Sequence, residues 1–231
     1  MCQVPEWSLG NVIYSLPSGL RVPPFGLLSL LMTPHPQRRR RGDDRREQII
    51  DQALHSFAAN GYHNSSIAEI ATRCGLSQTG LLHYFPNKAA LLAAVLDYRD
   101  RLDYDRLGMN RQLRGKDALQ QLVRLVEHNM HVPGLVQLFT VVTSEAVTSD
   151  HPARAWVVNR YRILETYLAE ALAGGITDGT FRPDIDAPAV ARQISAMMDG
   201  LQLQWLLDPE RVDMANLFRT YIDDLTIQLS A

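Results

Sequence analysis

Residues 74–92 of the chain read CGLSQTGLLHYFPNKAALL. It places a glycine, a serine, an aromatic pair and a proline between two segments whose apolar residues recur at helical spacing. Gly75 permits a reversal of the backbone, because glycine tolerates conformations that other residues avoid. Ser77 can cap a following helix, because its hydroxyl can accept a hydrogen bond from a free first-turn amide. The stretch therefore predicts a tight turn followed by a helix over residues 78–85.

The residues before this turn predict two more helices. In REQIIDQALHSFAANGY, residues 46–62, one apolar stripe runs to Asn60 and Gly61, where a helix is expected to stop. Ser66 then precedes an apolar residue and is followed three positions later by Glu69, which is the capping-box spacing of a helix start. A second helix is expected from about residue 67 to 73. Two short helices around a glycine turn make a helix-turn-helix.

In a helix-turn-helix the second helix lies in the DNA major groove, and its N-terminal residues contact base edges. Glutamine can bond adenine bidentately, and threonine can contact the thymine methyl group. A hydroxyl, a lysine and free helix amides suit phosphate, which describes Tyr84 and the segment 87–88. Leu82 and Phe85 are expected to face inward. The outward residues are expected to be Gln78, Thr79, Gly80, His83 and Tyr84.

The segment GYHNSSIAEIATRCGLSQTGLLHYFPNKAALLAAVL, residues 61–96, closely resembles the DNA-binding segment of TetR-family transcriptional regulators. The resemblance extends from about Arg46 to Leu96 and includes the glycine-serine turn and the aromatic pair before a proline. It implies an all-α homodimer in which an N-terminal three-helix domain with the helix-turn-helix binds double-stranded DNA. It also implies a larger C-terminal helical domain that binds an effector and supplies the dimer interface. The expected divisions are a leader over 1–41, a DNA-binding domain over 42–96 and a C-terminal domain over 97–231.

The same resemblance assigns roles by position. It implies phosphate contacts for Ser66, Thr79, Tyr84 and Lys88. It places near the bases the residues Gln78, Thr79, Gly80, Leu81 and His83. Many members carry a tyrosine and then a polar or basic residue before the aromatic pair, whereas this chain has Leu82 and His83. The base preference of the family therefore cannot be carried over.

The first 41 residues contain six prolines and show no sustained helical or strand period, so disorder is expected. Met32 immediately precedes a polar run, which leaves open whether residues 1–31 are translated in the native protein. The run 38–41, joined by two further arginines, allows two interpretations. It is either a flexible arm through which Arg40 and Arg41 reach phosphate or the minor groove, or a solvated charge run.

The remainder of the chain reads as helical. Residues 87–107 predict one long helix that joins the two domains. In a dimer, movement of this helix would change the spacing of the two recognition helices, which must match DNA half-sites ~34–36 Å apart. Further helices are expected over 116–130, 133–150, 151–175, 188–207 and 212–229. By resemblance the last two form a four-helix dimer bundle. Candidate residues of an effector pocket, each of which could instead be an ordinary core or surface residue, are His128, Met130, Phe139, Trp156 and Tyr161.

The composition and the motifs that the sequence lacks reduce the number of function classes that fit this chain. The net charge is only −2, so any signal for a polyanion must be local. Cys2 and Cys74 have no companion ligands at metal spacing, and the apolar run 25–32 is shorter than the roughly 20 residues that span a bilayer. Catalytic signatures are missing, so neither an enzyme nor a cofactor is expected. We expect a cytoplasmic repressor that a small-molecule effector releases from a palindromic operator, with a dimeric helical protein-binding adaptor as the alternative.

Overall fold

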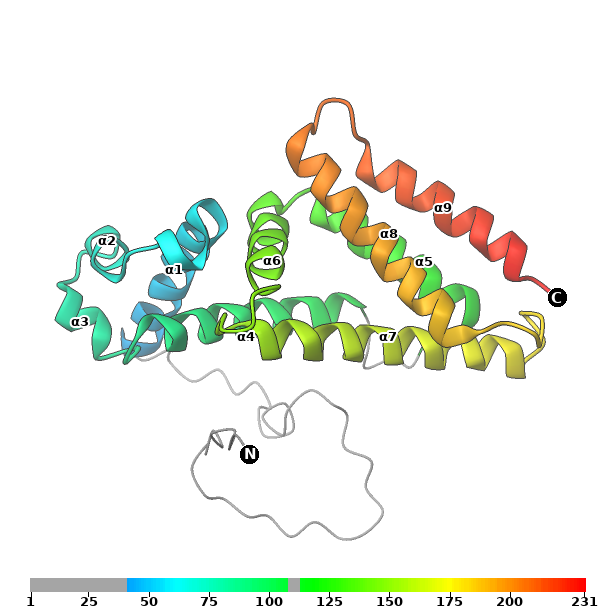
Figure 1. Ribbon diagram of the computed structural model, residues 1–231, viewed down its shortest axis with the longest axis horizontal. Coiled ribbons are helices and arrows are strands. Elements are labelled where there is room, and N and C mark those ends of the chain that lie inside the picture. Colours follow the sequence, from blue (N-terminus) through cyan, green and yellow to red (C-terminus); the bar gives the residue numbers. More distant parts are fainter. Residues whose placement is uncertain (1–40, 108–112) are drawn as a thin grey trace, which may run out of the picture. The chain divides into compact units, whose positions relative to one another are not determined.

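The computed structural model describes residues 41–107 and 113–231 (Figure 1). These residues fold into nine α-helices, and their sole extended pairing is an isolated antiparallel bridge between Phe181 and Ser230. The all-α class is therefore confirmed. The helices are α1 (Arg41–Asn64), α2 (Ile67–Arg73), α3 (Gln78–Leu82), α4 (Lys88–Leu107), α5 (Gly115–Asn129), α6 (Pro133–Glu145), α7 (Arg154–Thr177), α8 (Ala187–Leu207) and α9 (Met214–Leu229).

The first helix does not end where the sequence predicted. Helical structure resumes after Gly61, whose backbone is non-helical with φ 74° and ψ 177°, and continues to Asn64. Gly61 therefore breaks α1 internally. The buried stripe of α1, which includes Ile49, Ala53 and Phe57, was predicted correctly, and these three side chains are fully buried.

The helix-turn-helix follows its predicted capping chemistry with one change. The Ser66 hydroxyl accepts a hydrogen bond from the Glu69 amide at 3.5 Å, but the Glu69 carboxylate pairs with Arg73 at 2.7 Å instead of completing a capping box. Gly75 has φ 65°, as the turn requires. The Ser77 hydroxyl accepts from the Gly80 amide at 3.0 Å and starts α3.

Two of the predicted helix ends are shorter in the structure. Helix α3 ends at Leu82 and not near Phe85, because residues 83–87 form a turn before α4. Helix α6 ends at Glu145 and not near residue 150. The Asn87 side chain then caps α4, with its Oδ1 accepting from the Ala90 amide at 2.8 Å.

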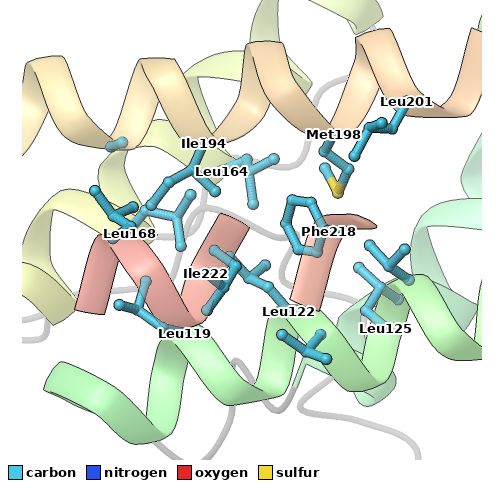
Figure 2. Close-up of a cluster of buried hydrophobic side chains, with 14 of the residues drawn as sticks. Leu119, Leu122, Leu125, Leu164, Leu168, Ile194, Met198, Leu201, Phe218 and Ile222 are labelled. Carbon is cyan, nitrogen blue, oxygen red and sulfur yellow. The ribbon is translucent and has the colours of Figure 1, made fainter. Parts of the chain in front are cut away.

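Two hydrophobic clusters hold the helices together. The first joins α1 to α4 with parts of α6 and α7, so it crosses the expected domain division at residues 96 and 97, which falls within α4. The second joins α5, α7, α8 and α9, whose side chains point toward one another in Figure 2. Each large aliphatic or aromatic side chain buried in this way stabilises the fold by roughly 1.5–3 kcal/mol. The labelled members are Leu119, Leu122, Leu125, Leu164, Leu168, Ile194, Met198, Leu201, Phe218 and Ile222.

None of the helices in the described ranges is both long and apolar enough to cross a bilayer.

Candidate DNA-binding surface and effector pocket

The outward face of α3 and of the turn after it consists of polar side chains, none of which is a lysine, an arginine or an acid. Gln78, Thr79, His83 and Tyr84 are exposed, and Gly80 is half-buried between them. Tyr84 retains 37% of its surface although it is a large aromatic residue. Side chains exposed on one face of a helix that follows a tight turn can enter a DNA groove without unfolding the protein.

One residue expected near the bases is placed elsewhere. The Leu81 side chain is fully buried in the first hydrophobic cluster, so it cannot contact a base edge. The reason is helical periodicity: Leu81 shares its face with Phe85, four positions on, and both point into the core. Leu82, expected to face inward, is only half-buried.

The Lys88 ammonium group forms hydrogen bonds within its own chain. Its Nζ donates to the carbonyl oxygens of His63 and Ser65, both at 3.1 Å, and lies 4.6 Å from the centre of the Tyr62 ring. The ammonium group therefore fixes the connection between α1 and α2, which carries the exposed cap residue Ser66.

A carboxylate from α6 fixes the break in α1. The Tyr62 amide donates to Glu145 Oε2 at 2.8 Å, directly after the left-handed Gly61. The same oxygen lies 3.5 Å from Nε2 of His151, whose side chain is fully buried, and His151 Nδ1 accepts from the Ala153 amide at 3.2 Å. Burial lowers the pKa of His151, and Glu145 partly opposes this shift.

The basic arm cannot be placed. Arg40 lies outside the described residues, and Arg41 begins α1 without a described side chain. The arm therefore stays a prediction.

A pocket lies between helices α4 to α8, with about 360 Å³ of space between atoms, part of which is open to solvent. Its apolar lining comes from Leu125, Phe139, Leu164 and Met198. The polar lining consists of Arg99, Asn129, Arg160, Tyr161, Asp199 and Gln202. A hollow that combines apolar walls with convergent polar groups is typical of a small-molecule site.

Charged and aromatic groups are paired closely around this pocket. The Tyr161 hydroxyl donates to Asp199 at 2.6 Å, and burial raises the pKa of both groups, although Arg160 and Arg99 oppose the shift of Asp199. Asp100 accepts from Arg160 at 2.6 Å and from the Trp156 indole at 2.7 Å.

Two further lining residues, Phe139 and Gln202, differ in how their polar or aromatic groups are occupied. The Phe139 ring has the Arg99 guanidinium 4.5 Å and the Arg160 guanidinium 5.2 Å from its centre. Gln202 is 3% exposed, and its Oε1 has no hydrogen-bond partner within the described part of the chain.

The five pocket residues expected from sequence divide into two groups. Phe139 and Tyr161 line the pocket, and Trp156 packs edge-on against Phe139 with ring centres 6.4 Å apart. His128 and Met130 are outside the lining, which takes the intervening Asn129 instead. No group of three or more His, Cys, Asp or Glu side chains suited to a metal occurs in residues 41–107 and 113–231.

Sequence reasoning missed the residues that give the pocket its chemistry. Asp199 and Gln202 could have been found as polar residues on the otherwise apolar face of α8. Arg99 carried a weaker signal, because a buried arginine inside a charged segment of α4 looks like its solvated neighbours.

The last two helices retain exposed apolar side chains. On α8 these are Met197, Leu203 and Leu207, and on α9 they are Leu217 and Ile227. Gly200 lies on the same face of α8 with open space where a Cβ would be. Apolar side chains exposed along two adjacent helices favour association with another surface.

An all-α chain that exposes a capped helix after a glycine turn, beside a separate helical pocket, is a helix-turn-helix regulator in form. Comparisons with known proteins agree. The sequence model of "Bacterial regulatory proteins, tetR family" matches residues 49–95, and that of "BetI-type transcriptional repressor, C-terminal" matches residues 116–226. The chain belongs to the TetR family of transcriptional regulators and is a DNA-binding repressor. The adaptor alternative is not favoured.

Individual relatives are distant but cover most of the chain. It is 27% identical over 192 residues to the HTH-type transcriptional regulator TtgR of Pseudomonas putida, covering 77% of this chain and 88% of that protein. It is 23% identical over 178 residues to the fatty acid metabolism regulator protein of Bacillus subtilis, covering 76% of this chain and 91% of that protein.

Solved structures resemble the fold. A TetR transcriptional regulator from Chloroflexus aurantiacus gives a TM-score of 0.70 at 22% identity, covering 83% of this chain and 98% of that one. A putative transcriptional regulator from Saccharomonospora viridis in complex with choline gives 0.64 at 26% identity, covering 79% and 95%.

Proposed function

We propose that this repressor binds a palindromic operator as a homodimer in the cytoplasm and leaves the operator when a small molecule occupies the pocket between α4 and α8. The observation that carries the DNA-binding part is the row of exposed polar side chains on α3 and the following turn. The proposal requires no catalytic step.

The side chains have separate roles in this proposal. Gln78, Thr79 and His83 contact base edges, and Gly80 allows the backbone to approach the groove. Tyr84 contacts phosphate and sets the register of the helix on the duplex. Ser66 contacts the adjacent phosphate, and the basic arm with Arg40 and Arg41 adds sequence-independent attraction.

Lys88 serves this surface mainly by position. Two of its donors are already directed to the carbonyl oxygens of His63 and Ser65, so its ammonium group holds the segment that presents Ser66. An ammonium group has three N–H donors, so only the donor that does not bond a carbonyl oxygen remains for a phosphate.

The homodimer is assigned to α8 and α9, the two helices with the exposed apolar residues. Pairing these helices across a two-fold axis would make a four-helix bundle and bury Met197, Leu203 and Leu217. The same axis would place two copies of α3 toward successive major grooves, about one DNA turn apart.

The effector is assigned to the pocket because α4 connects it to the DNA-binding surface. Arg99 of α4 lines the pocket, and Lys88 at the start of the same helix holds the α1–α2 connection. A ligand that displaces Arg99 would therefore shift a helix that supports the exposed face of α3, which we call the reading face (Gln78, Thr79, His83 and Tyr84). In a dimer a shift of a few ångströms changes the spacing of the two reading faces and weakens simultaneous docking.

The ligands named for similar proteins do not transfer simply. The structure of the Saccharomonospora viridis regulator contains choline. In this chain two guanidinium groups already lie over the Phe139 ring, where they would repel a quaternary ammonium.

Operator fragments selected from the protein's own genome provide the test. Binding measured by fluorescence anisotropy should weaken steeply as salt rises and should prefer the selected palindrome over random DNA. Gln78→Ala should change the preference at particular base pairs by ~1–3 kcal/mol, whereas Tyr84→Phe should weaken all sequences alike. A protein that shows neither salt dependence nor preference would not be a DNA-binding regulator.

A further inference from the structure

The ionised side chains around the effector pocket cancel one another. Arg160 is paired with Asp100 at 2.6 Å, while Arg99 and Arg160 both act electrostatically on Asp199. Two formal positive charges therefore face two formal negative charges. A ligand with a net charge would add an uncompensated charge to a partly buried site, which is costly because desolvation must then be offset by new pairing.

Cations of the chain itself lie over two aromatic rings in and beside the pocket, those of Phe139 and Trp156. The guanidinium groups of Arg99 and Arg160 lie 4.5 Å and 5.2 Å from the centre of the Phe139 ring, and Arg160 lies 5.7 Å from the Trp156 ring. Recognition of a ligand cation by aromatic rings needs a ring face that the cation can approach. Here the Phe139 and Trp156 rings already have the protein's own cations over them, and these cations would repel an approaching one.

One polar atom of the pocket points to a hydrogen-bond donor on the ligand. Gln202 lines the pocket, is 3% exposed, and its Oε1 accepts no hydrogen bond from the described residues. A buried acceptor without a partner is unfavourable, and such groups in native proteins usually indicate a missing ligand or water. Leu125, Leu164 and Met198 complete the lining with apolar surface.

We propose that this pocket takes a compact, uncharged molecule with an apolar body and one O–H or N–H group, which donates a hydrogen bond to Gln202 Oε1. Alcohols, phenols and neutral amides fit this description. The inference concerns binding alone, and it rests on the proposed function only for the consequence that binding releases the operator.

Four compounds with one carbon skeleton test the proposal by calorimetry on the full chain without DNA. Phenylpropanol carries a neutral donor, phenylpropionate an anion, phenylpropylamine a cation, and propylbenzene no polar head. Phenylpropanol should bind at least about tenfold more tightly than each of the other three, which is the effect expected of one satisfied buried acceptor. The proposal is overturned if a charged analogue binds best, if propylbenzene binds as well as phenylpropanol, or if phenylpropanol shows no binding at millimolar concentration.

The substitution Gln202→Met tests the role of the Oε1 atom. Gln202→Met keeps the length of the side chain and removes the acceptor, so phenylpropanol should bind about tenfold more weakly while propylbenzene is unaffected. Gln193→Met makes the same change on the exposed side of α8 and should alter neither. The unliganded melting temperature of Gln202→Met should not fall, because an unpartnered carbonyl is removed. An unchanged preference for phenylpropanol in Gln202→Met would overturn the role of Oε1.

The same compounds separate this inference from the proposed function. Operator release is measured independently by anisotropy. If phenylpropanol binds with the expected preference but does not release the operator, the inference stands and the effector part of the proposed function fails. If only the carboxylate or the ammonium compound binds and releases DNA, the function stands and the inference fails.

Discussion

Replacing Gly61 with alanine should destabilise the protein more than any other glycine substitution in the DNA-binding half, because two costs coincide there. The backbone at φ 74° and ψ 177° lies in a region open essentially to glycine, where another residue costs about 1–3 kcal/mol. An added Cβ would also lie 2.2 Å from Glu145 Oε1 and 2.9 Å from its carboxyl carbon. The carboxylate must therefore move.

Moving the carboxylate removes the hydrogen bond that it accepts from the Tyr62 amide at 2.8 Å. A hydrogen bond to a charged group contributes about 1.5–3 kcal/mol, so Gly61→Ala should lower the free energy of unfolding by about 2.5–6 kcal/mol in all. Urea unfolding followed by circular dichroism measures this loss. All variants must be compared at one protomer concentration, because the stability of a dimer depends on it.

Two companion variants decide whether Glu145 is responsible. Gly75→Ala has the same sign of φ, at 65°, but no atom within 4 Å of its Cβ, so it should show only the backbone cost. In a Glu145→Ala background the clash and the hydrogen bond are already gone, so Gly61→Ala should cost about 1.5–3 kcal/mol less than in the native chain. Equal losses for Gly61→Ala in both backgrounds would refute the reasoning.

Three further predictions follow from the same geometry. His151→Asn keeps an acceptor for the Ala153 amide but no longer titrates. Because burial lowers the pKa of His151, the native chain should lose stability as pH falls from about 6.5 through the folded pKa, and denaturation at several pH values should show a smaller loss in the variant. Gly200→Leu finds open space in the protomer but should weaken the dimer by the roughly 1–3 kcal/mol typical of overpacking, as sedimentation would show, whereas Gly134→Leu, at an equally open glycine on α6, should leave dimerisation unchanged. Lys88→Met should lower operator affinity without changing its salt dependence, since the ammonium is engaged with backbone carbonyls; a slope smaller by about one would instead reveal a phosphate contact.

The elements of this fold were accessible from the sequence because local rules govern them. Ser77 caps α3 and Gly75 makes the turn wherever the rest of the chain lies, so residue types at fixed offsets were sufficient. The error at Leu81 had a local origin too. The family resemblance places Leu81 near the bases by its position alone, whereas the helical period places it with Phe85 in the core.

The pocket could not be predicted in the same way. Arg99, Tyr161 and Asp199 come from three helices, and nothing in one helix specifies which residues of another will face it. His128 and Phe139 looked equally suitable as candidates, but only tertiary packing directs one of them toward the hollow. The attachment of Glu145 to the break at Gly61 joins residues 84 positions apart in the same way, through contact between α1 and α6.

The absence of lysine and arginine from the reading face of α3 bears on how the protein searches a chromosome. This face consists of Gln78, Thr79, His83 and Tyr84, so it has no lysine or arginine side chain. Retention on arbitrary DNA is supplied almost entirely by cationic groups. In this protein that retention has to come from groups outside α3, such as the proposed basic arm with Arg40 and Arg41, so scanning of the chromosome and selection of the target would depend on separate parts of the chain.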